Sequence, residues 1–390
     1  MKKILFFIAI TCLTNFVNAQ WQFAGMGGKS IHCFTARGTT IFSGTTGNGV
    51  FYSENTDTIW VAVDSGLTAP YINAMATCGN NVFAGTGDGV FLLTNSDSSW
   101  VAVDSGLTSH NISAMTVIGS NIYAGCFQLF LSTNNGTNWT LNSTDNFDYL
   151  TALASNGSDL FAVSEWQSGS GGLSGVFKKA SGDSTFTEIL NFFAAKKLAV
   201  SDSNIFVCGY SNIIYKSNDG GTTWITETTD HSAGYYNVYS ILINDTNVFV
   251  GLNNGKVFLS SFHDTSWTDI SNGLPNEPIS ALLVSGSYLY AGTGYHSGVW
   301  KRSLSEIMGI TELDKLNDID IYPNPATDLL YIEFSPNSEI QILNIEGQII
   351  KNLISAENNT TFDISAFARG MYFVKVKNEN GIAVKKLVKE

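Results

Sequence analysis

The sequence predicts an all-β protein made of two folded parts, and three observations support this prediction. The 390 residues include 37 glycines, 12% aromatic residues and only 14% charged residues, a composition typical of short strands joined by tight turns. A short apolar run followed by glycine and a turn recurs about every 40 residues as far as residue 303. The last part of the chain alternates apolar and polar positions between turns rich in Pro, Asn and Gly.

The N-terminus has the pattern of an export signal. Two lysines precede an apolar run, and Val17 and Ala19 place small residues before Gln20. This pattern predicts a signal peptide over residues 1–19 that is cleaved between Ala19 and Gln20. The apolar run is too short to anchor the chain across a bilayer, and we expect no transmembrane segment in the mature chain.

Self-comparison of the sequence shows seven copies of one unit between residues 20 and 303. A glycine, or in one copy a valine, marks the second strand of each copy: Gly44, Gly85, Gly125, Val163, Gly209, Gly251 and Gly292. An aromatic residue marks a second position: Trp21, Trp60, Trp100, Trp139, Phe186, Trp224 and Trp267. A period near 40 residues with four short strands is the signature of a β-propeller. We therefore predict an all-β, seven-bladed β-propeller closed by an N-terminal strand.

The two marker positions have different predicted roles. Glycine is expected where neighbouring blades crowd together or where the backbone bends, because neither arrangement leaves room for a side chain. The tryptophans are expected to pack between blades rather than to bind a ligand. An N-terminal strand on the last blade would remove an open sheet edge, and open edges invite aggregation.

One turn of the repeat carries a further motif. The stretch SNDGGTTW contains Ser217, Asp219, Gly221 and Trp224, and STNNGTNW at residues 132–139 is similar. The Asp219 carboxylate can accept backbone N–H groups while Gly221 permits unusual dihedral angles, so the motif predicts a tight turn. It resembles the Asp box of bacterial neuraminidase-type repeats, and other repeats resemble ligand-sensing propellers of two-component regulators. These resemblances imply a fold rather than an activity.

No catalytic constellation stands out in the sequence. Sialidases clamp their substrate carboxylate with three arginines, and the propeller region contains only Arg37 and Arg302, which argues against sialidase activity. No metal-binding, phosphate-loop or G-x-S-x-G pattern occurs, so no catalytic residue, metal or cofactor is predicted. The four cysteines of the mature chain match no metal pattern and are expected to be buried free thiols. The net charge of −13 argues against nucleic-acid binding.

A binding face is the remaining functional prediction for the propeller. The turns between second and third strands share one face with the loops between blades, and the longest such turn runs over residues 165–175. Aromatic rings there can stack on sugars or anchor protein partners, whereas the alternative is that each ring covers the base of its own loop. The candidate ligand-binding residues are Trp166, Tyr210, Tyr235, Tyr236, Tyr295 and His296.

The C-terminal part carries a second resemblance. The stretches YPNPATD, I-x-N-I-x-G-Q, DIS and RGMYFVKV closely resemble the type A sorting domain of the type IX secretion system of Bacteroidetes. The matching positions include Pro323, Asn324, Pro325, Gly347, Asp363, Gly370, Tyr372 and Lys386. The resemblance implies a small Ig-like β-sandwich over residues 317–390, with a linker over residues 304–316. It also implies type IX secretion machinery as a partner, and an extracellular or cell-surface destination after cleavage of both ends.

Three functions fit these observations. The first is an exported or cell-surface propeller that binds a glycan or a protein. The alternatives are an extracellular scaffold or assembly factor, and a secreted polysaccharide-acting hydrolase whose acid pair is assembled from different blades. The sequence leaves open the ligand, the content of the central funnel, the oligomeric state, and whether the protein is released or anchored.

Overall fold

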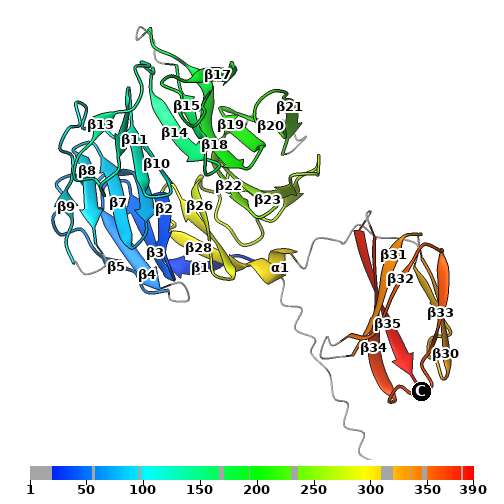
Figure 1. The fold of residues 1–390 in the computed structure, drawn as a ribbon. Coiled ribbons are helices and arrows are strands. Elements are labelled where there is room, and N and C mark those ends of the chain that lie inside the picture. The colour runs from blue at the N-terminus through cyan, green and yellow to red at the C-terminus, as the bar shows by residue number, and fades with distance from the viewer. Residues whose placement is uncertain are drawn as a thin grey trace, which may run out of the picture. The chain divides into compact units, whose positions relative to one another are not determined.

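The computed structural model contains two compact units, Met1–Leu304 and Ser305–Glu390, and each is described here by itself (Figure 1). The predicted signal peptide with Ala19, and residues 309–316 of the predicted linker, lie outside the described residues. The structure describes residues 20–54, 58–94, 98–166, 171–192, 194–229, 236–308, 319–334, 336–344, 349–378 and 381–390.

Antiparallel sheets of four strands make up the described part of the first unit, and they number seven. Three of them are β2 (Ile31–Arg37), β3 (Thr40–Thr45), β4 (Val50–Glu54) and β5 (Val61–Ala62); β6 (Ile72–Cys78), β7 (Asn81–Thr86), β8 (Gly89–Leu93) and β9 (Val101–Ala102); and β10 (Ala114–Ile118), β11 (Asn121–Gly125), β12 (Leu129–Ser132) and β13 (Thr140–Leu141). Three more are β14 (Leu150–Ser155), β15 (Leu160–Ser164), β16 (Gly175–Lys179) and β17 (Thr187–Leu190); β18 (Ala195–Ser201), β19 (Asn204–Gly209), β20 (Ser211–Ser217) and β21 (Ile225–Thr228); and β22 (Val238–Asn244), β23 (Asn247–Leu252), β24 (Val257–Ser261) and β25 (Thr268–Asp269).

The seventh sheet joins the two ends of the unit. Its strands are β26 (Ile279–Ser285), β27 (Tyr288–Thr293), β28 (Val299–Ser303) and β1 (Gln22–Gly25), and the helix α1 (Leu304–Met308) follows β28. Strand β1 pairs with β28 in antiparallel register, with Gln22 opposite Lys301 and Phe23 opposite Trp300. The predicted contribution of the N-terminus to the last sheet is therefore confirmed at the level of strand pairing.

The first strands of successive sheets lie side by side. Each of β2, β6, β10, β14, β18 and β22 contacts the first strand of the next sheet, and β26 contacts β2. The marker glycines sit at these junctions: a Cβ on Gly85 would come within 2.6 Å of Ile112, and a Cβ on Gly292 within 2.4 Å of Ile31. The predicted crowding is confirmed at these two glycines, because a side chain there would collide with the next sheet.

The tryptophan series links each sheet to the one before it. Five indoles donate a hydrogen bond to a backbone carbonyl three residues after the preceding aromatic marker: Trp21 to Ile270, Trp60 to Ala24, Trp100 to Val63, Trp139 to Val103 and Trp224 to Ile189. The predicted packing of these rings between sheets is thus confirmed. The outermost strands are short: β9 keeps only two residues, because the Trp100 indole before it bonds to the neighbouring sheet.

The motif between β20 and β21 forms the turn that its residues predict. Asp219 Oδ1 accepts the backbone N–H groups of Thr222 at 3.0 Å and Thr223 at 2.8 Å, and Gly221 has a φ of +95°. Hydrogen bonds from the Thr223 side chain and backbone and from Ser217 lower the pKa of Asp219 to about 2. Asn134 accepts the N–H of Asn138 at 3.0 Å in the equivalent turn before β13.

The second unit is a sandwich of two sheets around one apolar core. One sheet contains β29 (Asp320–Tyr322), β30 (Leu329–Glu333) and β33 (Asn359–Asp363), and the other contains β32 (Ile349–Ser355), β31 (Ser338–Leu343), β34 (Gly370–Asn378) and β35 (Gly381–Lys389). Leu330 and Ile332 of the first sheet pack with Ile340, Val374 and Val376 of the second. Both sheets therefore bury their apolar faces against each other.

In the second unit, a motif residue between β29 and β30 bonds to the last strand, β35. Asn324 donates to the carbonyl of Lys386 at 2.7 Å and accepts the N–H of Val388 at 2.9 Å. Tyr372 is buried and donates its hydroxyl to the Ala368 carbonyl at 3.0 Å, while Asp363 accepts the N–H of Ser365 at 2.9 Å. The bonds before Pro323 and Pro325 are cis. Gly347 lies outside the described residues.

Candidate functional site

A charged and aromatic cluster lies where β15, β18 and β19 begin or end on one face of the first unit. We call the face that carries the turns after second strands and the loops before first strands the loop face. Lys196 Nζ lies 2.9 Å from Glu165 Oε2 and 4.3 Å from the centroid of the Tyr210 ring. Burial alone would lower the pKa of Lys196, but hydrogen bonds with Tyr210 and Glu165 outweigh it and raise the pKa.

Among the described residues, no acidic side chain pairs with Lys197, the next residue along β18. A cavity of about 100 Å³ is lined by Lys197 together with Lys196, Gly209, Tyr210, Asn237, Val238 and Tyr239. Tyr210 and Tyr239 expose 50% and 41% of their surface, so aromatic rings stand at the cavity. Burial lowers the pKa of Lys197, whose charged or polarisable neighbours are Cys33, Cys208 and Lys196.

The same lysine interacts electrostatically across the centre of the unit. His32 and Cys33 lie on β2, which contacts β6 and β26, whereas β18 contacts β14 and β22. Desolvation, followed by the charge of Lys197, lowers the pKa of His32 to about 4. Burial raises the pKa of Cys33 and of Cys208 to about 12, so both thiols stay protonated at neutral pH.

The structure brings some of the predicted binding residues together and leaves others apart. Tyr210 joins the Lys196–Lys197 cluster, and Tyr236 is half-buried against the core of the sixth sheet. Trp166 is 57% exposed next to Glu165. The Tyr295 carbonyl and His296 Nδ1 both contact the Ser30 hydroxyl instead, next to the seventh sheet. Tyr235 lies outside the described residues.

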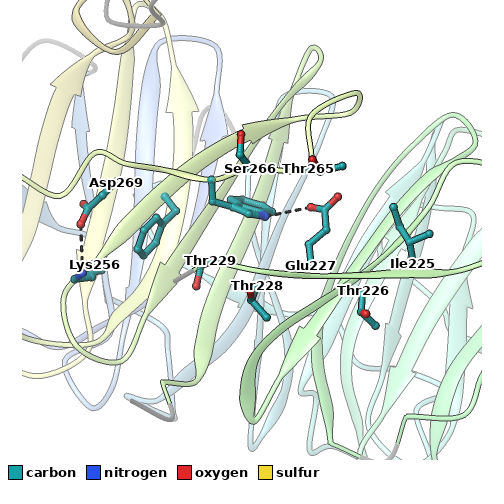
Figure 2. Close-up of a pocket in the computed structure, with 11 residues that line it drawn as sticks. Ile225, Thr226, Glu227, Thr228, Thr229, Lys256, Thr265, Ser266 and Asp269 are labelled. Atoms are coloured by element: carbon teal, nitrogen blue, oxygen red, sulfur yellow. Dashed lines mark hydrogen bonds and ion pairs between the residues drawn. The ribbon is translucent and has the colours of Figure 1, made fainter. Parts of the chain in front are cut away.

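A larger cavity opens at the outer rim between the fifth and sixth sheets. It has a volume of about 660 Å³ and lies between β21 and β25 (Figure 2). Trp267 Nε1 donates a hydrogen bond to the carboxylate of Glu227, one of the lining residues. Figure 2 shows Glu227 and, at one end, Lys256 paired with Asp269. We call this space the rim cavity.

The rim cavity arises where the repeat departs from its own pattern. In five sheets, the residue three positions after the aromatic marker is aliphatic, and its backbone carbonyl accepts the indole N–H of the next sheet. These residues are Ala24, Val63, Val103, Ile189 and Ile270. The fifth sheet has Glu227 there, and Trp267 Nε1 donates to its carboxylate at 3.1 Å. Lys216 Nζ lies 3.1 Å from the other carboxylate oxygen and donates to the Asp264 carbonyl at 2.8 Å. Both side chains of this ion pair are almost fully buried.

The buried pair predicts a specific pattern of stability losses. We expect Glu227→Ala to lower the free energy of unfolding by about 3–5 kcal/mol, because it leaves the Lys216 ammonium desolvated without its counterion. The double variant Lys216→Met with Glu227→Leu should lose less, since both charges are removed together. Urea unfolding of the wild type, Glu227→Ala and the double variant measures the difference. Equal losses in the single and double variants would contradict the assignment.

Sequence reasoning missed both Lys197 and Glu227. Lys197 stands among apolar and small residues of β18, and nothing in its local pattern shows that it faces a cavity. Glu227 carried a usable signal, because aligning the repeats on their aromatic markers exposes an acid where most copies have an aliphatic residue. The free thiols Cys33, Cys78, Cys126 and Cys208 agree with the prediction, although Cys33 is only half-buried. Among the described residues, no group of three or more His, Cys, Asp or Glu could hold a metal ion.

Comparison with known proteins identifies the C-terminal part. Residues 320–390 match the family of secretion system C-terminal sorting domains. An all-β chain with such a tail is an exported protein, sent by type IX secretion to the cell surface or the extracellular space. The tail implies interaction with the secretion machinery. No helix in the described part of the chain is long and apolar enough to cross a membrane.

Solved structures share the fold of the chain at low sequence identity. The extracellular domain of the one-component system BT4673 from B. thetaiotaomicron matches with a TM-score of 0.57 at 10% identity, over 93% of this chain and 57% of that one. PorZ, a surface component of the type IX secretion system of Porphyromonas gingivalis, matches with a TM-score of 0.52 at 14% identity, over 92% and 59%. YCF48 from Cyanidioschyzon merolae matches with a TM-score of 0.54 at 11% identity, over 73% and 98%. These likenesses show a propeller-like fold.

One curated protein shares sequence with part of the chain. It is the outer membrane protein assembly factor BamB of Yersinia pestis, which is 24% identical over 206 residues. The aligned part covers 48% of this chain, and the chain spans about half the length of BamB. Together with the sorting tail, these similarities fit a surface protein that interacts with other molecules.

Proposed function

We propose that this protein is an exported binding protein whose first unit is a closed seven-bladed propeller over residues 20–303. The cyclic contacts of the first strands and the packing of Gly292 against Ile31 support the closed ring. In this proposal the turns at residues 217–224 and 132–139 are Asp-box repeats, residues 304–316 are a linker, and residues 317–390 form an Ig-like sorting domain. The signal peptide and the sorting domain are both removed on export.

The proposed ligand site is the loop-face cluster, and the observation that carries it is that Lys197 has no acidic partner within the described part of the chain. Glu165 neutralises Lys196 at 2.9 Å, whereas Lys197 lines the cavity beside Tyr210 and Tyr239 without a carboxylate among its described neighbours. A partly desolvated ammonium is stabilised by an incoming anion. The exposed rings offer the apolar contacts that anchor protein partners. We therefore propose an acidic peptide segment of a protein partner as the ligand.

The similar structures support a peptide ligand over a polysaccharide. YCF48, which has the same fold class, has been solved bound to D1 peptide, with a TM-score of 0.57 to this chain. PorZ is a surface component of a secretion system. A glycan ligand bearing a carboxylate is the second outcome that the experiment below distinguishes.

Calorimetric titration of residues 20–390, the chain that has lost its signal peptide but keeps the sorting domain, tests this proposal. Hexaglutamate is the probe, hexalysine is its charge control, and hexagalacturonate represents an acidic glycan. We expect hexaglutamate to bind, and Lys197→Met to weaken it by about 10- to 100-fold, the loss of one hydrogen bond to a charged group. Lys351→Met is the matched control, because Lys351 is exposed on the second unit and should leave binding unchanged.

Two results would contradict the proposal. Unchanged hexaglutamate affinity in Lys197→Met would remove Lys197 from the site. Binding of hexagalacturonate in preference to hexaglutamate would assign the loop face to an acidic glycan instead of a protein partner.

A further inference from the structure

We propose that the rim cavity is a second binding site, separate from the loop face, and that it takes a neutral stretch of a sugar chain. The cavity lies between the outer strands of two sheets, whereas the loop-face cluster lies at the ends of β15, β18 and β19. Its volume of about 660 Å³ falls within the range of small-ligand sites in proteins. The two sites can therefore be tested independently.

The first argument is the buried ion pair of Glu227 and Lys216 at the cavity. Five other indoles of the series reach a backbone carbonyl, so a buried ion pair is not needed to close a junction between sheets. At this junction Glu227 accepts from Trp267 at 3.1 Å and from Lys216 at 3.1 Å. A buried ion pair stabilises a fold less than apolar packing of the same volume does, so its presence points to a role other than stability.

The second argument is an unsatisfied hydroxyl. Thr229 lines the cavity and is 6% exposed, and within the described residues its Oγ1 has no hydrogen-bond partner. Buried hydroxyl groups in native proteins are nearly always hydrogen-bonded, because an unpaired one loses its contacts with water without compensation. Because Thr229 Oγ1 is closed to solvent, a ligand hydroxyl in the cavity would supply the missing partner once the Thr229 side chain rotates toward it.

The third argument concerns the chemistry of the walls. The charges at the cavity occur in pairs, Glu227 with Lys216 and Asp269 with Lys256, so the site does not select an ion. The other lining side chains are mostly hydroxyls, from Thr226, Thr228, Thr229, Thr265 and Ser266, set beside the ring of Trp267. Hydroxyl donors and acceptors next to an aromatic ring complement the alternating polar edge and apolar face of a neutral sugar. A charged peptide or an acidic glycan would instead find no free counter-charge among these described lining residues.

Titration of the mature chain with neutral hexasaccharides tests this site. The probes are cellohexaose, xylohexaose, maltohexaose and chitohexaose, each followed by calorimetry and by the fluorescence of the tryptophans. We expect one of them to bind saturably, and Thr229→Val to weaken it about tenfold through the loss of one buried hydrogen bond. Thr187→Val is the matched control, because Thr187 is an exposed residue of the equivalent strand β17. Lys197→Met should leave this binding unchanged.

A second variant keeps the test decisive if Thr229→Val fails to fold. Thr265 is exposed on the same cavity, so Thr265→Val should fold normally and weaken the hexasaccharide several-fold. The absence of saturable binding of all four probes would overturn the proposal. So would equal affinity in the wild type, Thr229→Val and Thr265→Val, or preferential binding of hexagalacturonate.

Discussion

Replacing Trp21 by alanine is expected to lower the melting temperature of the mature chain by about 5–10 °C, since truncating a buried tryptophan costs about 3–5 kcal/mol. Trp21 is 2% exposed, and its indole donates to the Ile270 carbonyl at 2.7 Å, 249 residues away along the chain. It therefore links the two ends of the first unit. Calorimetric or fluorescence melting of the variant measures the effect.

The neighbouring strand residue supplies the control. Phe23 lies on β1 but is 50% exposed. Its ring packs edge to face with that of Trp300, with 5.6 Å between the ring centroids. Phe23→Ala should therefore shift the melting temperature much less. Deleting residues 20–25 should have the largest effect of all, because it also strips β28 of its partner strand and opens a sheet edge that promotes aggregation. An unchanged melt in Trp21→Ala would refute the proposed closure by the N-terminal strand.

Removing residues 305–390 is expected to abolish surface delivery while leaving the first unit folded. Each unit has an apolar core of its own, and that of the second unit includes Leu330, Ile340 and Val374, so we expect the first unit to fold by itself. In a host with a type IX secretion system, the truncated protein should accumulate in the periplasm. Surface labelling with antibody, together with protease protection in whole cells, measures its location.

The complementary fusion controls for loss of expression or folding. Residues 305–390 attached to a periplasmic reporter protein should carry the reporter to the cell surface or the medium. Surface display of the truncated protein would contradict the sorting role of the tail, and so would retention of a folded reporter that carries it.

The repeat features of the fold were accessible from sequence because they recur. A glycine such as Gly85 appears in almost every copy at the same phase, and the reason is that any Cβ at this position would collide with Ile112 of the next sheet. The tryptophans recur for a similar reason, since each indole closes the junction to the preceding sheet. Repetition turns a weak local pattern into a strong one, because the same packing requirement is imposed at each junction.

The residues of the proposed sites were less accessible because they are exceptions to the repeat. Tyr210 was predicted from its loop, and the structure adds Lys196 beneath its ring and Glu165 beside the lysine. His296 was grouped with Tyr210, but its contact is with Ser30. Loop residues from different sheets do not recur at one position of the repeat. Which of them lie together therefore depends on the tertiary structure.

By itself, the sequence determined the all-β class, the repeat, the pairing of the N-terminal strand with the last sheet, and the export tail. These depend on local alternation, on turn residues and on motifs within short stretches of chain. The tertiary structure alone decided that Lys197 lines a cavity without an acidic partner among the described residues, and that Glu227 and Lys216 are buried together beside an unsatisfied Thr229. The physical reason is that burial and charge pairing depend on distances between strands that the linear order of residues does not specify.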